Sequence, residues 1–111
     1  MTDVPTREEH RAPVDVHDIL DKLASLPIST WKYKSDDPSI RHIGPMSQDF
    51  AAAFGVGDSD KHIHIRDAMG VAFAAIRALN ELVESRAKEL AVLKKEVSEI
   101  RSQIRALSTG R

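Results

Sequence analysis

The residues of this chain best suited to chemistry are two histidines separated by one isoleucine. His62 and His64 are two positions apart, so in an extended segment their side chains lie on the same face. With a carboxylate such as Asp60, the two imidazoles could bind a metal ion. No third ligand stands at a spacing typical of a metal site, so we expect ordinary hydrogen-bonded or exposed histidines and no metal.

Other classes of site have still less support. The chain has no cysteine, which excludes disulfides, thiol catalysis and cysteine metal ligands, and no glycine-rich loop predicts a cofactor. Its net charge of −1 does not point to nucleic acid or to an anionic membrane. Lys32 and Lys34 alternate with Trp31 and Tyr33, but a hairpin with an aromatic core face and a solvated lysine face explains that pattern better than strand binding.

The dominant pattern is a heptad repeat over residues 69–107, which we call the seam. Its positions are spaced alternately three and four apart, and all are apolar except Arg86. The a positions are Met69, Ile76, Val83, Leu90, Val97 and Ile104, and the d positions are Ala72, Leu79, Arg86, Leu93, Ile100 and Leu107. No glycine or proline interrupts residues 71–109, so one continuous helix is predicted.

Such a helix would be roughly 58 Å long, whereas a compact domain of this size has a radius of gyration of about 13 Å. We therefore expect a stalk over residues 67–108 whose seam is covered by other chains, since no second helix of matching length is predicted. Glu89 and Glu96 at g can pair with Lys94 and Arg101 at e of a parallel neighbour.

The number of strands in the stalk is less constrained than its direction. β-branched residues at both a and d favour three strands, whereas Leu79, Leu93 and Leu107 at d favour two. We predict a parallel trimer and keep a dimer as the alternative. Arg86 either extends its head group to solvent, which we favour, or sets the register of the strands.

The preceding residues predict a small head over residues 15–66, after a flexible arm over residues 1–14. Asp15 is a candidate N-cap for a helix that Pro27 ends, residues 28–34 and 40–43 suit a hairpin, and Gly55 suits the end of a short helix over residues 46–54. Residues 62–65 read as a strand, and Asp67 lies in the first turn of the stalk. The fold class is α+β, and the expected head core is Trp31, Ile43, Met46, Phe50 and Phe54.

Three segments together resemble one known family. They are Asp18–Lys34 (DILDKLASLPISTWKYK), Ile40–Phe50 (IRHIGPMSQDF), and Asp67 followed by Gly70–Ile76 (GVAFAAI). The family is the C-terminal intramolecular chaperone auto-processing domain of phage tailspikes, tail fibres and endosialidases. The resemblance covers residues 14–107, and its most specific element is Ile43–Gln48, in which Ser47 replaces the commoner alanine.

The resemblance implies a homotrimer whose C-terminal helices template the folding of an upstream fibre. It also implies self-cleavage between a serine and an aspartate, with a downstream lysine as general base. The nearest counterpart here is Thr2–Asp3, with Arg7 where a lysine is needed, and arginine cannot act as a base. The first lysine, Lys22, falls in the predicted helix.

We therefore predict an intramolecular chaperone and trimerisation domain of a phage-type tail fibre or tailspike that does not cleave itself. The alternatives are an active auto-processing peptidase using Thr2, and a dimeric coiled-coil adaptor. Its expected partners are copies of itself and upstream fibre or spike domains, not nucleic acid or membrane. The resemblance implies a location in the cytoplasm of a bacterial host during assembly, or in the virion.

Overall fold

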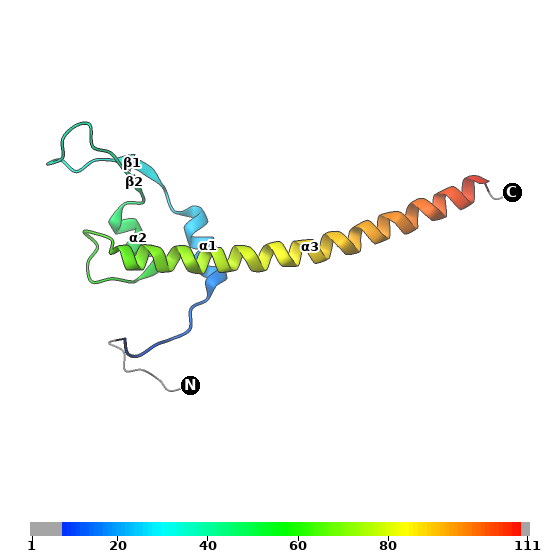
Figure 1. Cartoon of the computed structure of the whole chain (residues 1–111), viewed down its shortest axis with the longest axis horizontal. Helices are drawn as coiled ribbons and strands as arrows, with labels where there is room; N and C mark the ends of the chain where they lie inside the picture. Colours follow the sequence, from blue (N-terminus) through cyan, green and yellow to red (C-terminus); the bar gives the residue numbers. More distant parts are fainter. Residues whose placement is uncertain (1–7, 110–111) are drawn as a thin grey trace. The chain divides into compact units, whose positions relative to one another are not determined.

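The computed structural model describes residues 8–109, and it confirms an α+β fold with a short hairpin and a long C-terminal helix (Figure 1). The first seven residues, half of the predicted arm, lie outside the described part. In chain order the elements are α1 (Val16–Ser25), β1 (Ser29–Trp31), β2 (His42–Gly44), α2 (Ser47–Phe54) and α3 (Ile65–Thr109). The chain has two compact units, Met1–Ala75 and Ile76–Arg111, and α3 contributes residues to both.

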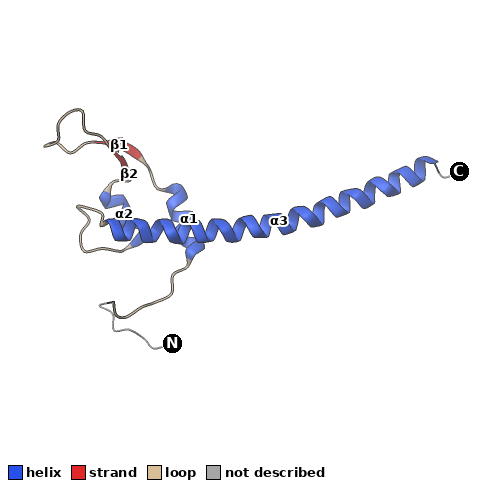
Figure 2. Cartoon of the chain, in the orientation of Figure 1, coloured by secondary structure: helices blue, strands red, loops and turns tan. Residues whose placement is uncertain are grey.

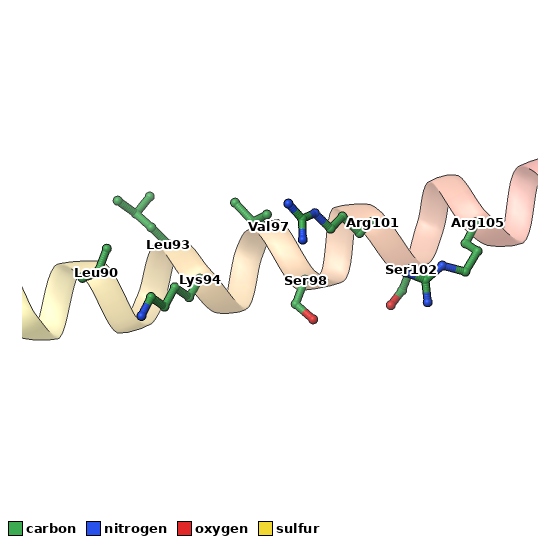
Figure 3. Close-up of a pocket in the computed structure, with 8 residues that line it drawn as sticks. All are labelled: Leu90, Leu93, Lys94, Val97, Ser98, Arg101, Ser102 and Arg105. Carbon is green, nitrogen blue, oxygen red and sulfur yellow. The ribbon is translucent and has the colours of Figure 1, made fainter.

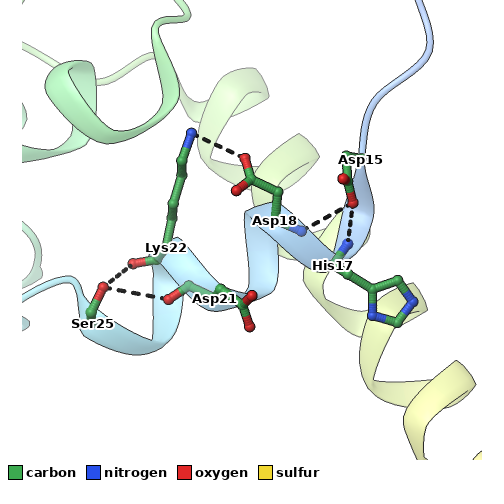
Figure 4. A network of polar contacts seen from close by, with 6 residues as sticks. All are labelled: Asp15, His17, Asp18, Asp21, Lys22 and Ser25. Atoms are coloured by element: carbon green, nitrogen blue, oxygen red, sulfur yellow. Dashed lines mark hydrogen bonds and ion pairs between the residues drawn. The ribbon is translucent and has the colours of Figure 1, made fainter.

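Helix α1 begins where the sequence predicts, because Asp15 is its N-cap. The Asp15 carboxylate accepts hydrogen bonds from the backbone N–H groups of His17 and Asp18, each at 3.1 Å. One turn later Lys22 Nζ lies 3.1 Å from Asp18 Oδ2, and the Ser25 hydroxyl donates to backbone carbonyls near the helix end (Figure 4). The cap satisfies N–H groups that have no partner within the helix.

The predicted hairpin is present, but its two strands are shorter than the sequence predicts. β1 and β2 are antiparallel, with Thr30 opposite Ile43, and each strand has only three residues (Figure 2). The Arg41 guanidinium donates to the carbonyl and the hydroxyl oxygen of Thr30, at 3.0 and 3.1 Å. Inside the connecting loop, the Asp36 carboxylate accepts from the backbone N–H of Tyr33. These local bonds take up backbone and side-chain groups that a longer ladder would have used.

Helix α2 ends at Gly55, as predicted. Gly55 has φ +62°, a left-handed conformation that costs glycine little, and its N–H donates to the Ala51 carbonyl. Phe50 is buried and Phe54 is half-buried, with ring centroids 4.9 Å apart. An apolar groove of about 370 Å³ lies beside Phe54, and it is also lined by Ile19 of α1 and by Val71 and Ala74 of α3. The three helices thus form the apolar centre of the first unit.

The prediction of a strand over residues 62–65 was wrong. Residues 55–64 are irregular, and α3 begins at Ile65, with the His64 carbonyl accepting from Ala68 N–H. The alternation of histidine and isoleucine is only four residues long. In the described chain β1 and β2 pair with each other and not with this segment. Backbone groups at His64 bond into the helix instead.

Helix α3 is continuous over 45 residues, or roughly 68 Å. Asp67 lies in its first turn, where a carboxylate interacts favourably with the helix dipole. Along residues 8–109 no helix combines the length and the apolar character that crossing a membrane requires.

Replacing Asp15 with alanine tests the capping of α1. We expect Asp15→Ala to lower the free energy of unfolding by about 1 kcal/mol, because two backbone N–H groups lose their acceptor. Urea unfolding followed by the fluorescence of Trp31, the only tryptophan, measures it. Asp21→Ala on the same helix is the control, since the Asp21 side chain caps nothing. Equal losses in the two variants would contradict the capping role.

Candidate functional site

The seam of α3 is a long apolar surface that is exposed in the described chain. Every residue over 83–109 is exposed in the single chain, including the apolar ones. The exposed fractions along the seam run from 46% at Val97 to 81% at Leu107. The other large apolar seam residues that are exposed are Met69, Ile76, Leu79, Val83, Leu90, Leu93, Ile100 and Ile104. Soluble chains rarely leave so long an apolar stripe in water.

The first turns of α3 have a second apolar face, which is already buried. Val71 and Ala75 are buried, whereas Met69 and Ile76 are exposed on the same stretch of helix. Successive helical residues are about 100° apart, so Val71 lies on nearly the opposite side from Met69. Packing within the first unit therefore uses a different face of α3 from the seam, and the seam stays free.

Charged residues flank the seam on both sides. Arg86, the one charged seam residue, donates to Glu89 at 3.0 Å, one turn along the same helix. Lys94, Glu96 and Arg101 have no ion pair within the described chain. Lys94, Glu96 and Arg101 thus remain beside an apolar stripe, whereas Glu89 is already paired with Arg86 of the same helix.

The middle of the stalk has a hollow of about 490 Å³, but all of its lining comes from one helix. Leu93 and Val97 project from one side of the ribbon, and Ser98 and Ser102 project from the other (Figure 3). A small molecule would be held on one side only, and binding sites for small molecules normally enclose most of the ligand surface. This surface suits another elongated helix better than a small ligand.

The five predicted head-core residues differ in burial within the single chain. Phe50 is buried, Trp31 and Phe54 are half-buried, and Ile43 and Met46 are 77% and 40% exposed. Ile43 faces away from the apolar centre because the hairpin containing it is too short to cover its own side chains. The exposed pair adds apolar surface to the first unit, as the seam does to α3.

Trp31 forms an aromatic cluster with Tyr33 and His42. The ring of Trp31 lies 4.9 Å from that of Tyr33 and 5.0 Å from that of His42, and His42 Nε2 is 3.2 Å from Asp36 Oδ2. Lys32 donates to the Tyr33 carbonyl at 2.9 Å, so it serves the hairpin locally. The prediction of an aromatic core face and a solvated lysine face was wrong in detail, because β1 ends at Trp31, Tyr33 is 51% exposed and Lys32 is half-buried.

Residues that could carry out self-cleavage are not assembled in the described chain. The candidate nucleophile Thr2 and the neighbouring Arg7 lie outside the described residues. Lys22 lies on α1, where it pairs with Asp18, and its side chain is 46% exposed. Lys22 is thus held in a local ion pair on α1.

The carboxylate that lies beside the two histidines is not the one that the sequence predicts. Asp58, not Asp60, lies beside them, with Asp58 Oδ1 at 2.7 Å from His64 Nε2 and 3.7 Å from His62 Nε2. The hydrogen bond from His64 lowers the pKa of the Asp58 carboxyl below its usual range. Sequence spacing favoured Asp60, but the turn after Gly57 brings the earlier aspartate back.

Comparison with known proteins gives one match. Residues 8–56 match the model of the family described as chaperone of endosialidase, which confirms the resemblance predicted from the sequence. The matched range includes α1, both strands and α2, and it ends before α3. No curated protein and no solved structure matches the chain.

Proposed function

We propose that this chain, whose residues 8–56 belong to the chaperone-of-endosialidase family, is an intramolecular chaperone that holds three copies of a phage-type tail fibre or tailspike together. The observation that carries the proposal is the exposed seam of α3. Family membership supports a chaperone role, and the seam supplies the means by which copies would associate.

Burial of the seam supplies the driving force for assembly. Each half-exposed leucine, isoleucine or valine that becomes covered contributes about 1–2 kcal/mol. Because the seam repeats over six heptads, these contributions accumulate along a single contact. In the second unit every residue over 83–109 is exposed in the single chain, so this part of the helix is stabilised mainly by association.

A second copy is a better occupant of the seam than an unrelated helix. The carboxylates at g and the cations at e, of which only Glu89 is paired within its own helix, are complementary when two identical helices run parallel and in register. Three strands are favoured because Val97, Ile100 and Ile104 place β-branched residues at both a and d in the last heptads. The partners are thus copies of the chain and the fibre or spike segments joined to them.

Assembly of the stalk would promote folding of the upstream segments by raising their local concentration. Three segments joined to one bundle meet at millimolar effective concentration, whereas free chains meet at their bulk concentration. The free energy gained in the stalk then offsets the entropy cost of association, so contacts within the fibre do not have to offset it. We further propose that the domain remains attached, because Arg7 stands where the family has a lysine base.

Substitution in the seam tests the assembly. We expect Ile100→Asp to convert the trimer to monomers, because three buried carboxylates would lie in one layer of the bundle. Val92→Asp is a matched control: Ile100 and Val92 are 53% and 57% exposed in the single chain, but Val92 lies at c, outside the seam. Light scattering of the purified chain measures the mass. A monomeric wild type would overturn the proposal, and a mass of two chains would replace the trimer by the dimer.

The chaperone role has a separate test. A fibre segment that does not trimerise alone is expressed with this chain fused behind it, and we expect the fusion to sediment as a trimer. The same fusion carrying Ile100→Asp should return to monomers or aggregate. Failure of the wild-type fusion to form trimers, while the isolated chain does form them, would refute the chaperone role alone.

Retention of the N-terminal residues tests the absence of cleavage. We expect the intact mass of the purified chain to be unchanged over days, because Arg7 stands where a lysine base is needed and cannot activate Thr2. A cut after Thr2 that disappears in Thr2→Ala would establish the peptidase alternative. A cut that persists in that variant is trimming by another enzyme.

A further inference from the structure

We propose that Asp58, His62 and His64 form a binding site for one divalent transition-metal ion, with Zn²⁺ as the best-suited probe. The three ligand atoms, one carboxylate oxygen and two imidazole nitrogens, lie within 4.8 Å of one another. This site lies in the loop between α2 and α3 and is independent of the seam. The proposal therefore does not rest on assembly of the chain.

The geometry of the cluster is close to that of a tetrahedral zinc site. Ligand atoms around tetrahedral Zn²⁺ are about 3.3 Å apart, because each lies about 2.0–2.1 Å from the metal. Asp58 Oδ1 is 2.7 Å from His64 Nε2 and 3.7 Å from His62 Nε2. Side-chain rotations alone can open the first distance and close the second. The ion would take the place of the proton that His64 shares with Asp58.

The donor set selects the class of metal. Two imidazoles and one carboxylate suit Zn²⁺, Co²⁺ and Ni²⁺, whereas Ca²⁺ and Mg²⁺ require oxygen ligands. Water can complete the coordination, because the side chains of Asp58, His62 and His64 are 76%, 54% and 49% exposed. Three protein ligands with one open position is a common arrangement for zinc.

The backbone of the loop brings the three ligands close together before any ion binds. Gly57 has φ +89°, a left-handed turn, and an added Cβ would lie 3.1 Å from Asp67 Oδ2. Lys61 N–H donates to the Ser59 hydroxyl, which tightens the turn between Asp58 and His62. The His64 carbonyl accepts the first helical bond of α3. A bound ion would tie this loop to the first turn of α3.

The positive end of the α3 dipole opposes a cation at this position. Two carboxylates offset that effect, since Asp58 is a ligand and Asp67 lies in the first turn of the helix. Within residues 8–109 no arginine or lysine forms an ion pair with Asp58; its ionisable neighbours are the two histidines. The carboxylate is thus free of any permanent cation that would compete with the metal.

Calorimetric titration of the purified, tag-free chain with ZnCl₂ tests the site. We expect one ion per chain, and a loss of affinity of more than about tenfold in His64→Ala and in Asp58→Asn, since each removes a ligand. His42→Ala is the matched control, because His42 also lies beside an aspartate, Asp36, but outside the cluster. That variant should bind as the wild type does, and CaCl₂ should give no binding heat.

A second measurement separates ligation from unfolding. Co²⁺ bound to the wild type should give the visible absorption of a tetrahedral site, and His62→Gln should abolish it while leaving Trp31 fluorescence unchanged. Absence of stoichiometric Zn²⁺ binding by the wild type would overturn the proposal. Equal loss of affinity in His42→Ala and His64→Ala would overturn it as well, since binding would then be adventitious.

Discussion

The structure depends on one constraint: the seam of α3 is apolar over six heptads, and a single chain does not cover it. All residues over 83–109 are exposed in the single chain, so this part of the helix has no tertiary packing of its own. An isolated helix in water is marginal even with favourable residues. The sequence therefore encodes a helix whose stability, in our proposal, comes from other copies of the chain.

The first unit is organised so that it does not compete for that surface. Val71 and Ala75 pack within it, whereas Met69 and Ile76 stay exposed on another side of the same helix. The family match ends before α3 begins, and the groove lined by Ile19, Phe54 and Val71 shows that the matched segment packs on the first turns of that helix. One helix thus contributes one face to the packing of the head and leaves another face, the seam, exposed.

Much of this could be predicted from local patterns, and the failures share a cause. Asp15, Gly55 and the uninterrupted helix-forming run of α3 act through neighbours in the sequence, so these features could be predicted directly. The sequence predicts a strand over residues 62–65, but contacts that its spacing does not reveal determine the structure there. The turn at Gly57 brings Asp58 to His64. The spacing also predicts Asp60 as the carboxylate beside the histidines, because it does not reveal this turn. The exposure of Ile43 likewise cannot be predicted from spacing alone.

Arg86 has a consequence for how parallel copies of α3 would line up. With the copies level, the guanidinium groups share one layer, and the adjacent Glu89 of each helix neutralises them locally. If one copy slides by a heptad, its arginine moves beside leucine at Leu79 or Leu93, and the damage spreads to two layers instead of one. One charged position in an otherwise apolar seam would thus make every shifted alignment of the helices less stable than the level one.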